Sequence, residues 1–458
     1  MTKLIYLLFF TLLSLGCNES KDEIEERKNP PIPKPEDFNP QIAHGIEEVG
    51  SPIRASHLEE LKKKVGTNRS NKEGFHGQGV TIAILDNGFV GLDKAKGVTV
   101  PPDVTIEPIH SGEMGKSIHG TKLLEIAYAV ATGSPRYDAK LPSPDFKLFV
   151  TSGAYDNLNS SVARLVDMKN SNPSKPLIVL YAQNWEWGGN LNEDGYTGFI
   201  DYLAKYATDS GIIWLNSAGN AGQSTYIDTV SLDEKGNLKL PVDGKYLEFE
   251  VTQRTTVKMT LGWNDFRNNF YTYRTPYDLD LILEDAEGNV KGESKKIQDG
   301  QDHGDNKSYS RHAREMLKGT LNPGSYRIRA SARTDFYEGA KFWFVASGQG
   351  VFLKQRSQEN TVFMPAHLES VVAVGASDVD FGGFSIEDGV TTKPDIFCPS
   401  QMFFESARPI QGTSTATAVC VGALAAYASA QDGILFRNSV EALAYEDSKG
   451  RMRLNLSK

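Results

Sequence analysis

Cysteine is scarce in this sequence. Its 458 residues contain 3 cysteines, at positions 17, 398 and 420. No Cys/His cluster has the ligand spacing of a zinc site, so the sequence gives no indication of zinc chemistry. Cys398 and Cys420 either pair or remain buried free thiols, and the sequence leaves both interpretations open.

Positive charge is also in short supply. The chain has 49 Lys and Arg against 58 Asp and Glu, which gives a formal net charge of -9, and no basic stripe interrupts this balance. Nucleic acid is therefore not expected as a main partner. The rest of the composition is that of a globular protein, and the length allows two or three domains around a large core.

A long apolar run occurs at the N-terminus. Residues 4–16, "LIYLLFFTLLSLG", follow Lys3 and are too short to span a bilayer comfortably. With a small residue before Cys17, the run resembles a bacterial lipoprotein signal, whose Cys becomes lipidated. The resemblance implies a signal peptide over 1–16 and a lipid-anchored protein exported to the bacterial cell envelope or cell surface. A plain secretory signal with an incidental Cys is the other interpretation.

The next segment, 17–49, is charged at first and then rich in proline, with almost no apolar content. Such a composition cannot bury a core, so it predicts a disordered tether. From about residue 76 onward, short apolar β-branched runs such as "GVTIAILD" alternate with helical patterns. This alternation predicts βαβ units, hence a three-layer α/β domain with a parallel sheet. The pattern stops near Gly222 and returns after residue 350.

Between these two parts the apolar residues alternate with period two, and turn residues separate the runs. This pattern predicts an antiparallel β-sandwich over 223–350, inserted into an α/β domain made of 50–222 and 351–458. One stretch, "SRHAREMLKG" (310–319), also fits a helical pattern, so a helix is the alternative there. Asp278 and Asp280 share one face of a predicted strand here. Their oxygen ligands suit a structural Ca²⁺, and a solvated strand face is the alternative.

Three short stretches of the α/β part carry reactive side chains at element ends. "AILDNG" ends a strand with Asp86, "IHGT" begins a helix with His119, and "GTSTA" begins another helix with Ser414. A nucleophile, an imidazole base and an orienting carboxylate are what acyl transfer requires. Ser414 alone is more typical of a helix cap, so the interpretation depends on the other two residues.

These stretches resemble the motifs of the subtilases, the subtilisin-like serine peptidases. "GQGVTIAILDNG", "HGTKLLEI" and "GTSTATA" resemble the Asp, His and Ser motifs, in the Asp-His-Ser order of that family. "NSAGNAG" resembles its oxyanion-hole loop, and "PAHLESVVAVGASD" with "KPDIFCPS" resembles the region before the Ser motif. The resemblance covers roughly 50–222 and 351–458. It implies a subtilisin-like fold and a serine endopeptidase that cleaves protein or peptide substrates through an acyl-enzyme and requires no cofactor.

The resemblance also implies a role for each residue. His119 would accept the proton of Ser414, Asp86 would hold the imidazole, and Asn220 would donate to the oxyanion. Taken alone, Asn220 is equally typical of a turn. The substrate-facing edge would be formed by Ala182, Gln183 and Asn184.

Several positions depart from the family pattern. Lys122 stands where the family usually has a second His, Glu125 where it has Gly, and Ala418 where it has Pro. Trp185 and Trp187 near the substrate edge either shape a cleft or cover the core. No inhibitory prodomain is recognisable between Cys17 and the α/β domain. These departures motivate an alternative, a catalytically inactive surface binding lipoprotein. An esterase is less favoured because Ser414 lacks a Gly-x-Ser-x-Gly context.

Overall fold

The protein is described from a computed structural model, and its contacts divide the chain into residues 1–38 and 39–458. The structure describes residues 46–109, 114–186, 199–265, 274–304, 306–348, 350–357, 360–379, 382–383, 385–387, 390–431, 437–449 and 451–456. The expected signal peptide, Cys17, most of the tether and Trp187 lie outside these residues, so the expectations about them stay predictions.

An eight-stranded sheet forms the centre of the α/β part, in the order β18-β19-β17-β14-β4-β3-β1-β2. The strands are β1 (Thr81–Asp86), β2 (Asp145–Val150), β3 (Leu177–Tyr181), β4 (Ile213–Ser217), β14 (Val372–Ala376), β17 (Ile396–Cys398), β18 (Ala444–Glu446) and β19 (Met452–Leu454). All neighbours pair in parallel except β18 with β19. The predicted parallel sheet is therefore confirmed.

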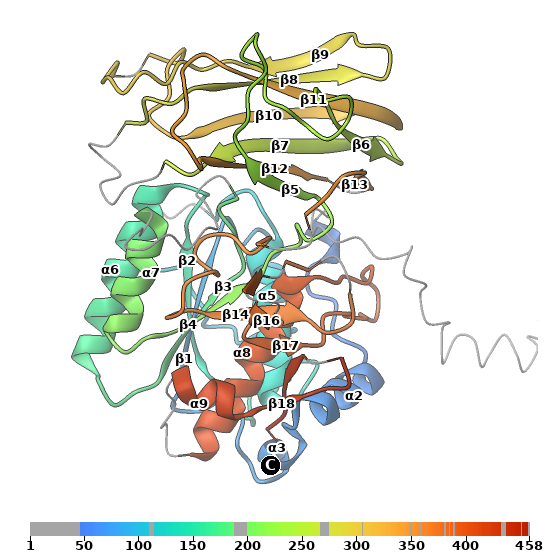
Figure 1. Cartoon of the computed structure of the whole chain (residues 1–458). Helices are drawn as coiled ribbons and strands as arrows, with labels where there is room; N and C mark the ends of the chain where they lie inside the picture. Colours follow the sequence, from blue (N-terminus) through green and yellow to red (C-terminus); the bar gives the residue numbers. More distant parts are fainter. Residues whose placement is uncertain are drawn as a thin grey trace, which may run out of the picture. The chain divides into compact units, whose positions relative to one another are not determined.

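Helices cover both faces of this sheet (Figure 1). The helical elements are η2 (Ile46–Glu48), α2 (Ala55–Val65), α3 (Asn68–Lys72), α4 (Leu92–Ala95), α5 (His119–Thr132), α6 (Tyr155–Ser171), α7 (Phe199–Asp209), α8 (Thr413–Ala430) and α9 (Arg437–Ala442). Successive side chains of a strand point to opposite faces. Ile82 and Ile84 of β1 belong to the core that contains α5 and α8, whereas Ala83 and Leu85 belong to the core that contains α6 and α7. The three-layer prediction is confirmed.

Helix α8 lies in the core between α5 and the sheet. A Cβ on Gly422 would approach the carbonyl oxygen of Ala127 to 2.5 Å, so glycine allows the close contact with α5. By length and composition α8 could cross a membrane, but 78% of its apolar window is buried within the protein, which is typical of a core helix. Cys420 of α8 and Cys398 of β17 are buried free thiols that interact with each other.

The inserted region forms two packed antiparallel sheets, β10-β7-β12-β5 and β13-β6-β11-β8-β9. Their strands are β5 (Thr225–Thr229), β6 (Leu247–Val251), β7 (Thr255–Trp263), β8 (Leu279–Asp285), β9 (Val290–Ser294), β10 (Arg314–Leu321), β11 (Gly324–Ala332), β12 (Lys341–Ser347) and β13 (Val351–Leu353). A separate hairpin joins β15 (Ser385–Glu387) and β16 (Val390–Lys393). The predicted sandwich is confirmed, while the exact domain boundaries stay a prediction.

The helix considered for 310–319 is wrong, because most of this stretch belongs to β10. Arg314–Leu321 pairs along its whole length with β7. Glu315 and Leu321 are buried, whereas Met316, Lys318 and Thr320 are exposed. A strand in a sandwich needs only such a partial alternation, and pairing with β7 outweighs the helical preference of Glu, Met, Leu and Lys.

Candidate active site

Asp86 and His119 meet where β1 ends and α5 begins. Asp86 is fully buried, and its Oδ2 lies 2.5 Å from Nδ1 of His119. The other carboxylate oxygen accepts a hydrogen bond of 3.3 Å from the Gly88 N–H. An ionised carboxylate only accepts, so Nδ1 carries the shared proton and Nε2 is left as the basic nitrogen of the neutral ring.

The environment of His119 favours its charged form. Burial of the ring lowers the pKa of His119, but the charge of Asp86 and the hydrogen bond to it act in the opposite direction and leave the pKa raised. The side chain remains 19% exposed. Among the described residues, Asp86 is the one hydrogen-bond partner of the ring, so Nε2 is accessible for proton transfer.

A glycine makes the approach of α5 to Asp86 possible. A Cβ on Gly120 would lie 2.7 Å from the carbonyl oxygen of Gly88 and 2.8 Å from Cβ of Asp86. Such contacts are too short for any other residue without movement of the backbone. Gly120, which directly follows His119, therefore leaves the space that the His119 imidazole needs to reach the Asp86 carboxylate.

Ser414 is the second residue of α8 and is partly exposed. Gly412, with a φ of 136°, turns the chain into the helix. The Ser414 hydroxyl donates to the carbonyl oxygen of Ala182, at 3.3 Å. No hydrogen bond joins Ser414 to His119 within the described part of the chain. A nucleophilic Ser414 would have to exchange the Ala182 oxygen for Nε2 of His119 as its hydrogen-bond acceptor.

Asn220 is attached to the start of α8. Its Oδ1 accepts hydrogen bonds from the Thr413 N–H, at 3.0 Å, and from the Thr413 hydroxyl, at 3.1 Å. A backbone N–H can only donate, so it identifies the bonded side-chain atom as oxygen and leaves Nδ2 as the free end. Nδ2 has no partner among the described residues, and Asn220 is exposed. The Asn220 side chain is thus oriented by Thr413, the first residue of α8, rather than by hydrogen bonds within the turn that contains Asn220.

Two donors therefore stand at the beginning of α8. The first-turn amides of a helix have no intrahelical acceptor, and the Ser414 N–H has none within the residues that the structure describes. The Asn220 Nδ2 is the second donor. Both lie at the positive end of a buried 18-residue helix, which favours negative charge.

The predicted substrate edge follows β3 directly. Ala182 supplies the carbonyl that accepts from Ser414. The backbone carbonyl of Gln183 accepts a hydrogen bond of 3.1 Å from the Asn216 side-chain amide. The side-chain amide of Asn184 donates to the Ser217 hydroxyl, also at 3.1 Å. The edge is thus bound to the end of β4, close in sequence to Asn220. Its role towards substrate stays a prediction.

Trp185 packs in the core. It is 8% exposed, its N–H donates to the Met364 carbonyl at 2.9 Å, and its ring N–H donates to the Tyr181 hydroxyl at 2.7 Å. Of the two interpretations considered, the core contact is confirmed for Trp185, whereas Trp187 is outside the described residues.

Two departures from the family pattern form a buried ion pair. Lys122 Nζ lies 2.7 Å from Glu125 Oε2, and each side chain is 2% exposed. Lys122 also donates to the Glu48 carbonyl at 3.1 Å, while Glu125 Oε1 accepts from the Gly50 N–H at 2.7 Å. Thr99 donates its hydroxyl to the same oxygen, at 2.8 Å. The pair thus ties the helix of His119 to residues 48–50. Sequence reasoning missed this role, although two opposite charges three positions apart in an apolar helix were the available signal.

The calcium expectation at Asp278 and Asp280 gains no support from the geometry. Both side chains are buried, so the solvated strand face is wrong. Both oxygens of Asp280 accept from Nε of Arg333, at 3.0 and 2.9 Å. Across the described ranges, no group of three or more His, Cys, Asp or Glu could hold a metal ion.

Burial and then the charge of Asp280 raise the pKa of Asp278 to about 6.

Comparison with protein-family models gives no match, and comparison with curated protein sequences gives none either. Several solved structures of bacterial serine proteases do match. The CspB protease of Clostridium perfringens is 14% identical, with 87% of this chain and 96% of that chain covered and a TM-score of 0.49. EpiP of Staphylococcus aureus, an epidermin leader peptide processing serine protease, is 14% identical, with 88% and 80% covered and a TM-score of 0.39. A lanthipeptide protease is 11% identical, with 92% and 98% covered and a TM-score of 0.41. Likenesses this distant carry no conclusion about activity, which has to be argued from the site.

Proposed function

We propose that the protein is a subtilisin-like serine endopeptidase that uses Asp86, His119 and Ser414. The observation that carries this proposal is the 2.5 Å hydrogen bond between the buried Asp86 and His119, which leaves the second imidazole nitrogen available. The helix of His119 packs against α8, whose second residue is the partly exposed Ser414. The free donors at that helix start support the same reaction, because acyl transfer develops negative charge on an oxygen.

In the proposed reaction, Ser414 Oγ attacks the carbonyl carbon of a peptide bond while its proton passes to Nε2 of His119. The tetrahedral intermediate collapses, the C–N bond breaks, and His119 gives the proton to the leaving amine. Water then attacks the acyl-enzyme with His119 again as base, and the carboxylic acid product leaves. Asp86 stays ionised throughout and stabilises the imidazolium.

The proposed oxyanion site consists of Nδ2 of Asn220 and the Ser414 N–H. In subtilisin, removal of the oxyanion-hole Asn lowers turnover by about 10²–10³, and this value sets the scale expected for Asn220. The hydrogen bonds from Thr413 to Oδ1 of Asn220 would keep the donor in place without reorganisation during the reaction.

We further propose that the protein is exported and anchored through a lipidated Cys17. This part of the proposal rests on the apolar run at 4–16 and the charged, proline-rich segment that follows. Metabolic labelling with an alkyne-bearing palmitate, with Cys17→Ala as control, tests it. Equal labelling of the wild-type protein and the Cys17→Ala variant would contradict the lipid anchor at Cys17.

An inactive binding lipoprotein is the second candidate, and one observation favours it. The Ser414 hydroxyl donates to Ala182 rather than to His119. If this rotamer persisted with substrate present, the serine would not be activated. Proton transfer contacts often form fully only in the substrate complex, so the free geometry is compatible with both candidates.

Digestion of an unstructured protein separates the two. The purified chain and its Ser414→Ala variant would be incubated with casein, and new peptide ends would be identified by mass spectrometry. We expect internal cleavage by the wild type and none by the variant. Intact casein with a folded wild-type chain would favour the binding protein.

A further inference from the structure

The ends of two neighbouring strands flank Ser414. Strands β3 and β4 pair in parallel, with Tyr181 opposite Asn216, so their carboxyl ends lie side by side. Ala182 follows β3, and its carbonyl accepts the hydrogen bond of the Ser414 hydroxyl, at 3.3 Å. Asn220 follows β4 and is bonded to the first residue of α8, directly before Ser414. A peptide carbonyl attacked by Ser414 therefore lies between these two strand ends.

The side chain of Asn184 crosses the gap between the two strand ends. Its amide donates to the Ser217 hydroxyl at 3.1 Å and so connects the segment after β3 to the last residue of β4. Gly219, with a φ of 92°, lies directly against it, since a Cβ on Gly219 would be 3.3 Å from Nδ2 and 3.4 Å from Cγ of Asn184. The amide group thus occupies the space between the segment after β3 and residues 217–219.

The position of Asn184 is not explained by stability alone. Its Oδ1 is buried and has no hydrogen-bond partner within the described part of the chain. A buried acceptor without a partner is costly, because it has lost its hydrogen bonds to water and gained none in the protein. Local arrangements that oppose stability are expected mainly at functional sites, so this side chain is a candidate for a role towards substrate.

The backbone around Asn184 is held on both sides. The Gln183 carbonyl accepts a hydrogen bond from the Asn216 amide at 3.1 Å. The Trp185 N–H donates to the Met364 carbonyl at 2.9 Å, and the Trp185 side chain is buried. A substrate side chain that enters the gap therefore meets a fixed segment, so the amide of Asn184 limits the space that is left.

We propose that Asn184 determines specificity by restricting the residue on the acyl side of the cleaved bond to glycine, alanine or serine. This inference rests on the proposed peptidase function. The side chain of that residue enters the space between the two strand ends, where the amide of Asn184 already lies. A hydrogen atom, a methyl or a hydroxymethyl group fits beside the amide. A larger side chain would require Asn184 to move and to give up its hydrogen bond to Ser217.

Mapping of the cleaved bonds tests the proposal. The wild-type protein and its Asn184→Gly variant would digest casein, and mass spectrometry would identify the residue before each new peptide end, with Ser414→Ala as the blank. We expect the wild type to cut after glycine, alanine and serine. The variant should also cut after large apolar residues such as leucine and phenylalanine, because glycine at position 184 leaves the gap open.

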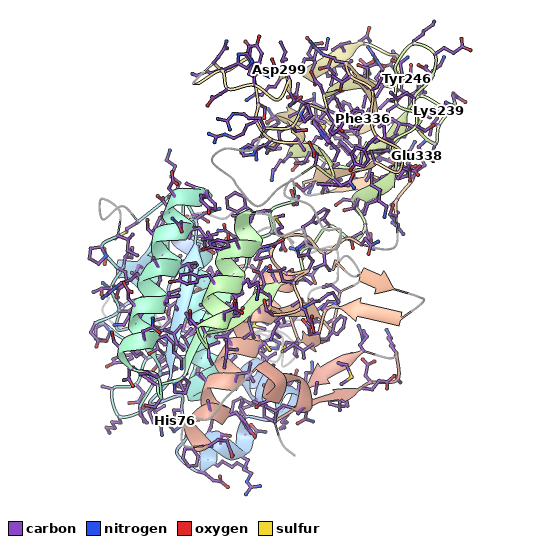
Figure 2. The ribbon with its side chains drawn as sticks, turned by 60° about the vertical axis from the view of Figure 1, so that its left-hand side comes forward. His76, Lys239, Tyr246, Asp299, Phe336 and Glu338 are labelled. Atoms are coloured by element: carbon purple, nitrogen blue, oxygen red, sulfur yellow. The ribbon has the colours of Figure 1, made fainter. Side chains whose placement is uncertain are left out.

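Two peptides that differ only in the residue before the cleaved bond, alanine or phenylalanine, give the size of the effect. We expect the wild type to favour alanine in kcat/KM by about 100-fold, which is the scale of a steric misfit in a tight pocket. Asn184→Gly should reduce this ratio by about tenfold or more. Lys239→Ala is the control, because Lys239 is exposed and belongs to the sandwich, where Figure 2 labels it. It should change the ratio by less than about twofold.

Folding of each variant is checked by circular dichroism, because Asn184→Gly removes a hydrogen bond. Ser217→Ala is the second variant, since it keeps Asn184 but releases its amide, and it should lower the same ratio by a smaller factor. Cuts mainly after large residues by the wild type, or an unchanged ratio in both variants, would overturn this inference and leave the proposed peptidase intact. Intact casein with a folded wild-type protein would contradict the peptidase and this inference together.

Discussion

At the scale of single residues, His119 connects structure to pH dependence. Its pKa is raised by Asp86, so the folded protein holds this proton more tightly than the unfolded chain does. The resulting contribution to stability is fully present below the usual His pKa of about 6.5 and is lost as pH rises through the folded pKa. Catalysis has the opposite dependence, because the proposed general base must be neutral.

Asp86→Asn should therefore change both rate and pH profile. The amide removes the charge that raises the His119 pKa and no longer fixes the required tautomer. We expect kcat to fall by about 10⁴, as for the equivalent change in a serine protease, and the acidic limb of the pH profile to move to lower pH. Initial rates with a chromogenic peptide between pH 5 and 9 measure both. An unchanged acidic limb would contradict the role of Asp86.

Asn220 allows its two ends to be tested separately. Asn220→Asp keeps an oxygen that accepts from the Thr413 N–H but removes the Nδ2 donor. We expect stability close to that of the wild type and a kcat lower by about 10²–10³. Asn220→Ala should lose the donor and also about 1 kcal/mol of stability from the helix start. If the Asp variant retained full kcat, Asn220 would not be an oxyanion donor.

At the scale of elements, the Lys122–Glu125 pair joins α5 to residues 48–50. Lys122→Met would leave Glu125 buried without its cation, which costs about 3–5 kcal/mol. Lys122→Met with Glu125→Gln should cost less than the sum of the single changes, because the charges disappear together. Urea unfolding measures these losses, with the exposed Lys63→Met as control. Additive losses would show that the two charges do not interact.

The sandwich has its own expected pH dependence. Burial raises the pKa of Asp278 to about 6 and that of Glu315 to about 7, so the folded form binds these protons more tightly than the unfolded form. Their contribution to stability is therefore fully present below pH about 4 and is lost as pH rises through 6 and 7. Glu315→Gln should flatten the fall in thermal midpoint between pH 5 and 7.5. A slope identical to that of the wild type would assign the dependence to other groups.

At the scale of the whole molecule, the inserted sandwich contacts the loop that follows the predicted substrate edge. The Trp343 ring N–H donates to the Glu186 carbonyl at 2.6 Å, and Lys258 pairs with the Glu186 carboxylate at 3.1 Å. Because Glu186 lies two residues after Asn184, the sandwich supports the segment that we propose to face substrate.

Much of this architecture was predictable because it repeats locally. Period-two and helical patterns indicated the layers, and the resemblance to the subtilase motifs implied the contact between Asp86 and His119. Features that depend on distant partners were not predictable. Lys122 is buried against the nearby Glu125, but its second acceptor, the Glu48 carbonyl, is distant in sequence, as is Arg333, the partner of Asp280. The strand at Arg314–Leu321 depends in the same way on its pairing with β7.

The central claim is that Ser414 is a nucleophile activated by His119. The most direct measurement is covalent labelling by a fluorophosphonate probe, read as the intact mass of the folded protein and then located by peptide mapping. We predict one adduct per chain, on Ser414, that disappears in Ser414→Ala and forms far more slowly in His119→Ala. A folded wild-type protein that remains unlabelled, or an adduct on another residue, would contradict the account.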